Sequence, residues 1–184
     1  MKISSIAKWP LAAAAATLLV AAPARAQIDR SGPYVVASVG ASSYDYDCYF
    51  FSSCDHAHAT VFRLGGGYRF GVFALEGWLS DFGGANLPWQ QSLRVRGAGI
   101  GGAWVMQFSP TVHGLIRGGI AQMRQTRTHE IASSAIEPTF GLALLVDLTP
   151  TLALETSYDA TTSSGDNSGS VLAQGLSIGL RLRF

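Results

Sequence analysis

Residues 171–184 read VLAQGLSIGLRLRF, and this stretch decides the fold. From Leu172 to Phe184 every second residue is large and mostly apolar, while the residues between them are small or cationic. A strict period of two places alternate side chains on opposite faces of a β-strand. One face then suits lipid, and a terminal aromatic residue is typical of a membrane interface. The pattern predicts that the chain ends as a strand of an outer-membrane β-barrel.

The first 26 residues have the features of an export signal. Two lysines precede an apolar run at residues 11–22, and small residues up to Ala26 match the spacing that a signal peptidase needs. The run is too short to span a bilayer as a helix. We expect cleavage near Ala26, which removes a signal peptide at 1–26 and leaves one barrel domain at 27–184.

The net charge argues against nucleic acid as a partner. The whole chain carries +1, but the signal holds three of its 13 basic residues and none of its 12 acidic ones. The mature protein then has 10 basic and 12 acidic residues, a net charge of −2. No basic patch of the kind that nucleic acid requires is left, so nucleic-acid binding is excluded.

Eight segments of the mature chain alternate as the last one does. They cover residues 33–42, 59–70, 73–82, 93–107, 112–124, 136–148, 152–159 and 171–184. Short connections at 71–72, 108–111 and 149–151 alternate with long polar ones at 43–58, 83–92, 125–135 and 160–170. Strands enter hydrocarbon only when every backbone polar group is paired, which requires closure. We expect an all-β, eight-stranded antiparallel up-and-down transmembrane β-barrel with short periplasmic turns and longer extracellular loops.

The Gly71-Val72 turn sets the register of its hairpin, because a glycine at the first central position permits a type II′ turn with Phe70 opposite Phe73. An arginine on the lipid face costs about 2–4 kcal/mol near the midplane, so charged strand residues should point inward or lie near the ends. Eight strands enclose just enough space for side chains, which favours an ion network over an aqueous pore. The members expected in this barrel-interior network are Arg63, Arg69, Glu76, Arg94, Arg96, Arg117, Glu155, Arg181 and Arg183.

Glu76 is also the residue that invites a catalytic interpretation, because a buried carboxylate can act as an acid or a base. A carboxylate surrounded by arginines is instead held ionised and paired. We therefore assign Glu76 a structural role and predict no catalytic residue, cofactor site or metal site.

Two hairpins and the tail resemble known outer-membrane proteins. Gly67-Tyr68-Arg69-Phe70, a tight turn and Ala74-Leu75-Glu76-Gly77-Trp78 resemble strands two and three of the OmpA-like, OmpX/Ail-like and opacity-type small barrels. Residues 148–155, LTPTLALE, with Tyr158-Asp159, resemble their penultimate hairpin. The resemblance covers essentially the whole mature chain. It implies an integral protein of the Gram-negative cell outer membrane, without the periplasmic peptidoglycan-binding domain of full-length OmpA.

The resemblance also implies partners. The alternating tail, with Leu180, Leu182 and Phe184, is similar to the signal that the barrel-assembly machinery recognises. Outer-membrane lipid and lipopolysaccharide are expected to surround the barrel. Members of these families are variously similar to adhesins, complement-evasion proteins, membrane tethers and small channels, so a host, matrix or cell-surface ligand is a further expected partner.

The first loop holds the most distinctive sequence. Tyr49, Phe50 and Phe51 are candidates for contact with a protein ligand, because dense aromatics anchor interfaces. Tyr44 and Tyr46 are assigned instead to the aromatic girdle where the strand leaves the bilayer.

Cys48 and Cys54 are the only cysteines, and the compartment is oxidising. Their even number and short spacing predict a disulfide bond that stiffens the loop. A free redox pair is one alternative. Zinc binding by both cysteines with His56 and His58 is another, although the spacing matches no common structural zinc pattern.

We expect a structural, surface-exposed barrel that acts in adhesion through its extracellular loops. Two other functions are alternatives. Small residues expected to face inward, namely Gly65, Gly67, Gly102, Gly175, Ser177 and Gly179, favour a narrow porin-like channel for small solutes. A third loop with His129, Glu130, Ser133, Ser134 and, beyond it, Glu137 contains the residue types of a hydrolytic triad, as in barrels that deacylate lipid A. The spacing departs from the His-x-Ser arrangement of those enzymes, so we expect no enzymatic activity.

Overall fold

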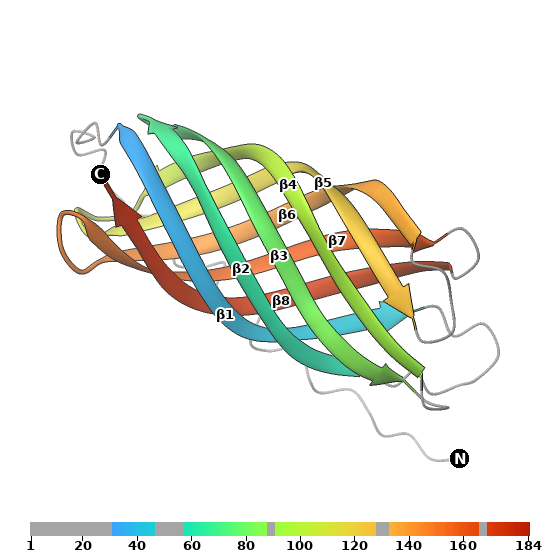
Figure 1. Ribbon diagram of the computed structural model, residues 1–184. Helices are drawn as coiled ribbons and strands as arrows, with labels where there is room; N and C mark the ends of the chain where they lie inside the picture. Colours follow the sequence, from blue (N-terminus) through green and yellow to red (C-terminus); the bar gives the residue numbers. More distant parts are fainter. Residues whose placement is uncertain (1–30, 47–56, 88–90, 128–132, 166–168) are drawn as a thin grey trace, which may run out of the picture.

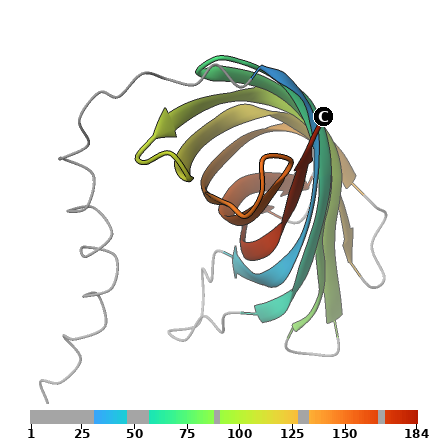
Figure 2. The ribbon, with the colours of Figure 1, turned by 90° about the vertical axis from the view of Figure 1, so that its left-hand side faces the viewer.

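The computed structural model describes residues 31–46, 57–87, 91–127, 133–165 and 169–184. These residues form eight antiparallel strands in chain order (Figure 1). The strands are β1 (Gly32–Tyr46), β2 (Ala57–Phe70), β3 (Phe73–Leu87), β4 (Gln91–Gln107), β5 (Val112–Arg127), β6 (Ser133–Asp147), β7 (Leu152–Gly165) and β8 (Gly169–Arg183). The sheet closes on itself as a barrel, seen from its turn end in Figure 2. The predicted fold class is confirmed. Among the same residues, no helix is long and apolar enough to cross a membrane.

The last strand shows how the alternating sequence becomes two faces. Leu176, Ile178 and Leu180 lie on the outer face and are about half exposed, whereas Ser177 and Arg181 are buried in the interior. The other strands follow the same rule, and large apolar side chains cover the outside of the barrel. The most exposed members of this belt include Phe73, Leu75, Ile100, Ile136 and Phe184. Such a belt suits contact with lipid chains.

The seam of the barrel joins the first strand to the last. Tyr34 lies opposite Arg183 and Tyr46 opposite Val171. Beyond the last pair, the Phe184 amide donates to the Pro33 carbonyl at 3.1 Å. An up-and-down barrel closes only if its last strand pairs with its first, and the β1–β8 register shows this pairing. Closure leaves no open edge at which another chain can pair.

The three short turns have two kinds of local structure. Gly71 adopts a positive φ of 61°, and Phe70 pairs with Phe73, as the type II′ prediction requires. The other two turns share one motif, a Ser or Thr followed by Pro-Thr. In each, the hydroxyl of Ser109 or Thr149 accepts two backbone hydrogen bonds, at 3.3 and 3.0 Å. Each turn is therefore fixed by its own local sequence.

The strands run further toward the loops than the sequence indicated. Only residues 88–90 separate β3 from β4, so most of the predicted loop at 83–92 is strand. A β-bulge between Asp81 and Gly84 interrupts the alternation there and hid the continuation. The predicted loop at 160–170 is also shorter, because β7 extends to Gly165 and β8 begins at Gly169. A bilayer needs about 9–11 residues per strand, so strands of 14 to 17 residues extend past the membrane on the loop side.

We predict that Gly71→Ala lowers the free energy of unfolding by about 1–2 kcal/mol, because an L residue is strained at positive φ. The measurement is urea unfolding of the refolded protein in detergent micelles. Gly118→Ala is the matched control, since a Cβ there meets nothing within 4 Å. Equal effects of the two substitutions would contradict the assigned turn conformation.

Candidate functional site

Charged side chains from five strands meet in the barrel interior. We call this group the central ion cluster. Its members are Arg63 on β2, Glu76 on β3, Arg117 on β5, Glu155 and Asp159 on β7, and Arg181 on β8. Five of these side chains are at most 7% exposed, and Asp159 is 25% exposed. Three arginines face three carboxylates, so the group carries no net charge.

Glu76 is the hub of the cluster. Its Oε1 accepts hydrogen bonds from the Tyr34 hydroxyl at 2.6 Å and from Arg181 Nη2 at 3.4 Å. Its Oε2 lies 3.2 Å from Arg117 Nε and 3.7 Å from Arg63 Nη2. Four strands other than its own thus supply its partners. This arrangement agrees with the structural role that the sequence predicted for Glu76, because its contacts are with three arginines and one hydroxyl group of the barrel wall.

The two carboxylates of β7 complete the charge balance. Glu155 Oε2 accepts from Arg181 Nε at 2.7 Å, and its Oε1 accepts from Arg117 Nη2. Asp159 Oδ1 accepts from Arg63 Nη1 at 2.7 Å and lies 3.6 Å from Arg117 Nη1. Arg117 therefore contacts all three carboxylates. A buried charge is tolerated only when it is paired in this way.

Aromatic rings cover two of the arginines. The guanidinium carbon of Arg181 lies 4.2 Å from the centre of the Tyr34 ring, and that of Arg63 lies 5.3 Å from the Trp78 ring. Such contacts are attractive because the ring face is electron-rich. They also occupy space beside the guanidinium groups, so the cluster is enclosed by side chains.

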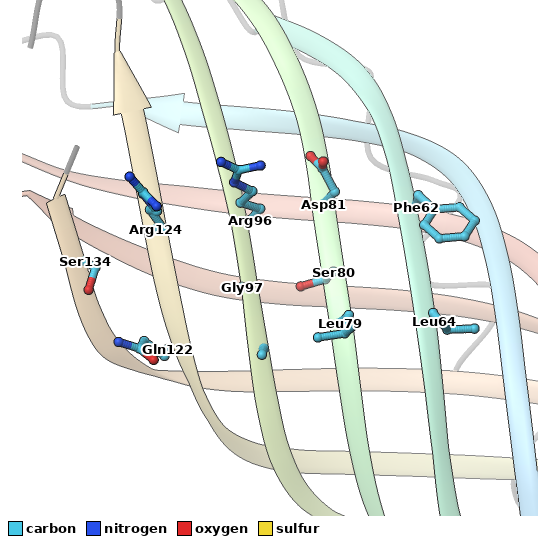
Figure 3. A pocket seen from close by; sticks show the side chains of 11 residues that line it. Phe62, Leu64, Leu79, Ser80, Asp81, Arg96, Gly97, Gln122, Arg124 and Ser134 are labelled. Carbon is cyan, nitrogen blue, oxygen red and sulfur yellow. The ribbon is translucent and has the colours of Figure 1, made fainter. Parts of the chain in front are cut away.

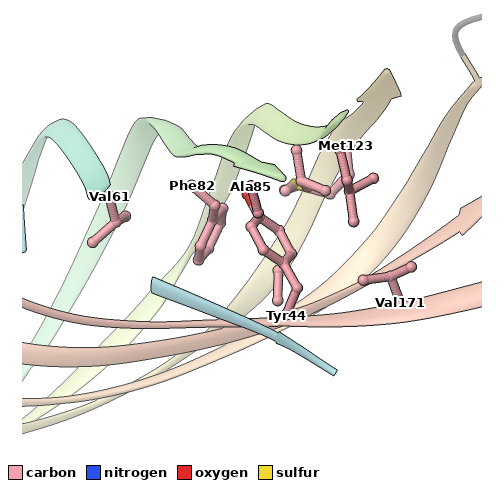
Figure 4. Close-up of a cluster of buried hydrophobic side chains, with 10 residues drawn as sticks. Tyr44, Val61, Phe82, Ala85, Met123 and Val171 are labelled. Carbon is pink, nitrogen blue, oxygen red and sulfur yellow. The ribbon is translucent and has the colours of Figure 1, made fainter. Parts of the chain in front are cut away.

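An apolar layer closes the interior on the loop side of the ion cluster (Figure 4). Its buried members are Tyr44, Val61, Phe82, Ala85, Leu93, Val95, Ala121, Met123, Val171 and Ala173. Tyr44 is fully buried, and its hydroxyl donates to the Gly83 carbonyl at 2.7 Å. The Ser42 hydroxyl donates to the Phe82 carbonyl at 2.5 Å. These two bonds tie β1 across the interior to the bulged part of β3.

A second apolar layer lies on the turn side. It contains Tyr34, Ala74, Ala103, Val105, Leu115 and Leu145. Nearer the turns, Asp147 is held between His113 Nε2 at 3.1 Å and Arg183 Nη2 at 2.5 Å. A cavity of about 310 Å³, lined in part by Arg69, Arg181 and Arg183, lies at this end. The interior thus alternates between apolar and charged layers along its length.

The predicted charge network is partly brought together. Arg63, Glu76, Arg117, Glu155 and Arg181 do meet in the central ion cluster. The remaining inward members lie apart from it, near the turns: Arg183 pairs with Asp147, and Arg69 Nε donates to the Gly71 carbonyl at 2.7 Å.

Two members of the predicted network do not lie in the interior. Arg94 and Arg96 are exposed on the outer face of β4, near the loop end. Their neighbours Leu93 and Val95 fill the apolar layer on the loop side, and alternation then turns both arginines outward. Arg94 pairs there with Asp81. Gly102, expected among the inward small residues, is also exposed on the outer face.

The sequence reasoning missed four partners: Tyr34, His113, Asp147 and Asp159. Asp159 lies four residues after Glu155, so alternation places both carboxylates on the inner face of β7. That spacing was a usable signal. Asp147 and His113 could not be assigned in this way, because they lie at strand ends beside the turns.

The loop predictions fall largely outside the described residues. Cys48, Tyr49, Phe50, Phe51 and Cys54 all lie there, so the disulfide and the aromatic contact remain predictions. Of the alternative zinc ligands, the structure describes only His58, which is exposed. Within the described ranges, no three His, Cys, Asp or Glu side chains gather in a way that suits a metal ion.

Tyr44 does not belong to a lipid-facing aromatic girdle, as was predicted. Its ring packs in the apolar layer inside the barrel, because its position in the alternation of β1 points inward. The side chain of Tyr46, assigned to the same girdle, lies outside the described residues.

The described residues of the hydrolytic alternative, Ser133, Ser134 and Glu137, lie apart on β6. Ser134 is exposed on the outer face, whereas Glu137 is buried and accepts a hydrogen bond from the Thr162 hydroxyl at 2.8 Å. Ser133 shares the face of Glu137 but lies four residues away, about 13 Å along an extended strand. His129 and Glu130 lie outside the described residues. No serine and carboxylate of β6 are thus within hydrogen-bond reach.

The tail residues of the assembly prediction face outward. Leu180, Leu182 and Phe184 are 48%, 46% and 76% exposed. These side chains thus lie on the outer face of β8, and recognition by the barrel-assembly machinery remains a prediction.

A closed antiparallel barrel with an apolar exterior and a charged interior defines the class of integral outer-membrane barrels. Residues 12–184 match the family model described as the outer membrane protein beta-barrel domain, and the chain belongs to this family. Among curated proteins, no sequence is significantly similar to it.

Solved structures share the fold. Neisserial surface protein A matches with a TM-score of 0.70 and 17% identity, over 84% of this chain and 98% of that protein. Ail, the attachment invasion locus protein of Yersinia pestis, matches with a TM-score of 0.53 and 15% identity, over 82% and 99%. OprG from Pseudomonas aeruginosa matches with a TM-score of 0.50 and 10% identity, over 87% and 99%. At these identities the likeness shows the fold alone.

We predict that Glu76→Gln lowers the free energy of unfolding by about 3–5 kcal/mol, because it leaves three buried arginines with two carboxylates. Urea unfolding of the refolded protein measures this loss. Asp81→Asn removes the same charge from an exposed pair with Arg94 and serves as the matched control, with a much smaller effect. If both variants unfold alike, the central ion cluster does not stabilise the barrel.

Proposed function

We propose that this protein is a structural outer-membrane barrel that displays its extracellular loops for adhesion, with the loop at 47–56 as the contact segment. The observation that carries the proposal is the filled interior. Two apolar layers and a neutral ion cluster occupy the space that a channel would need. A rigid scaffold of this kind leaves specific binding to its loops.

A small cavity beside the central ion cluster supports the same proposal. It has a volume of about 30 Å³ and is lined by Arg63, Trp78 and Asp159, among others. That volume holds only about one or two water molecules. The cavity at the turn end is larger, but the ion cluster and the apolar layer on the loop side lie between it and the extracellular end.

The anchoring of β1 suits a loop that is held firmly at its base. Tyr44 is buried in the interior and hydrogen-bonded to Gly83, three residues before the contact segment begins. A disulfide between Cys48 and Cys54, which we include in the proposal, would lower the ordering cost of contact further. Tyr49, Phe50 and Phe51 then present the apolar surface that a protein ligand or matrix component recognises.

The proposal includes no enzymatic activity. The separation of Ser133 and Ser134 from Glu137 supports this part of it. Intact acyl chains after prolonged incubation of lipid A with the purified barrel are the expected result. Released fatty acid would overturn the exclusion.

We predict that the refolded protein gives no conductance steps in planar bilayers at neutral pH. An ion that crosses the interior must displace the apolar side chains and break the ion pairs. Its free-energy barrier is therefore higher than in a water-filled pore. The protein is delivered to the bilayer from proteoliposomes. Its folded state in them is verified on a gel by the band that shifts when the sample is boiled, that is, by heat-modifiability. Regular conductance steps would instead support the channel, the second candidate function.

We predict that replacing residues 47–56 by a Gly-Ser linker of equal length abolishes adhesion of bacteria that display the protein to cultured epithelial monolayers. Tyr44 is kept, because its loss would disturb the interior. A Gly-Ser replacement of residues 128–132 is the matched control and should leave adhesion unchanged. Unaltered adhesion after the first replacement would remove the proposed contact segment.

A further inference from the structure

Two arginines that form no ion pair with any residue of the described ranges lie side by side on the outer face of the barrel. Arg96 on β4 and Arg124 on β5 are direct cross-strand partners, and both are exposed. Neither forms an ion pair or a hydrogen bond with a described residue, although Asp81, which pairs closely with Arg94, also attracts Arg96 electrostatically. Like charges directly opposite one another destabilise a sheet. A bound anion would therefore stabilise this pair of arginines.

The height of this pair places it at the edge of the membrane. Arg96 lies 11 residues from the turn end of β4, and Arg124 lies 12 residues from the turn end of β5. With the usual rise and tilt of barrel strands, these positions are roughly 28–30 Å above the turns. The apolar band of such barrels is about 25 Å tall. Both guanidinium groups are thus level with lipid headgroups on the loop side.

A hollow in the outer surface joins these charges to an apolar wall (Figure 3). It has a volume of about 680 Å³. In the register, one row of paired residues reads Phe62, Asp81, Arg96, Arg124 and Ser134, and the next row toward the turns reads Leu64, Leu79, Ala98, Gln122 and Ile136. Polar groups thus line the loop side of the hollow, and mostly apolar side chains line the side toward the membrane centre.

We propose that this hollow binds one phosphorylated glycolipid of the outer leaflet, with a lipid A phosphate between Arg96 and Arg124 and an acyl chain against Leu64 and Leu79. Guanidinium groups match phosphate oxygens with two parallel hydrogen bonds each. A bound phosphate also removes the repulsion between the paired arginines. The apolar wall selects an acylated ligand over a free anion, so the charge and the surface together point to a lipid.

Asp81 limits the positive charge of the proposed lipid site. It lies opposite Arg96 in the row and engages Arg94 through both carboxylate oxygens. Its charge keeps Arg94 away from the phosphate and limits the positive charge of the hollow. Removing that carboxylate frees a third arginine for the ligand.

The test is native mass spectrometry of the refolded barrel in a non-ionic detergent, with bis-phosphorylated lipid A as the probe. We expect Arg96→Gln with Arg124→Gln to weaken lipid A binding by about tenfold or more, because charge-assisted hydrogen bonds are lost. Arg96→Lys with Arg124→Lys keeps the charge but loses the paired hydrogen bonds, so its affinity should lie between those of the original protein and the Gln variant. Asp81→Asn should bind as tightly or more tightly.

Two further probes separate the lipid from the anion. Dephosphorylated lipid A with the same acyl chains should bind the original protein about as weakly as lipid A binds the Gln variant. Inorganic phosphate at the concentration of the lipid should not displace bound lipid A. Equal binding of lipid A by the Gln variant and the original protein, equal binding of the two lipids, or displacement by phosphate would each overturn the proposal. All variants change outward-facing residues, and heat-modifiability confirms that each one folds.

Discussion

Backbone amides and carbonyls cannot remain unpaired in hydrocarbon, and the rest of this structure depends on that constraint. Pairing of β1 with β8 satisfies the last two edges, which forces all eight strands into one closed sheet. Closure divides every strand into a lipid face and an interior face. The interior of an eight-stranded barrel is narrow, so each inward residue has a neighbour across the lumen as well as along the sheet.

That narrow interior explains why the charges are balanced. Water is largely excluded, so each guanidinium needs a carboxylate within reach. Arg117 meets this need for three carboxylates at once, and Tyr34 adds a donor to Glu76. The apolar layers on both sides separate the cluster from solvent, which strengthens its electrostatic interactions. A filled lumen and a neutral interior are two results of the same geometry.

The sequence predicted the barrel, the strand order, the register of the β2–β3 hairpin and five of the six members of the central ion cluster, because each follows from alternation and short turns. It misplaced Arg94, Arg96 and Tyr44 for one physical reason. The usual rule assigns apolar residues to lipid, but near the loop end this barrel also fills its interior with apolar side chains. There both faces suit apolar residues, and alternation alone no longer identifies the inner one. The bulge between Asp81 and Gly84 removed the remaining signal.

The position of Arg181 has a consequence for how the barrel folds. This residue is on the last strand, yet its guanidinium contacts Glu76 on β3 and the Tyr34 ring on β1. These contacts span up to 147 positions of the chain and form only when the seam between β1 and β8 closes. Contacts of such long range are slow to form. Until then the carboxylates and guanidinium groups remain hydrated, so loss of that water and closure of the seam are a single, late step of folding.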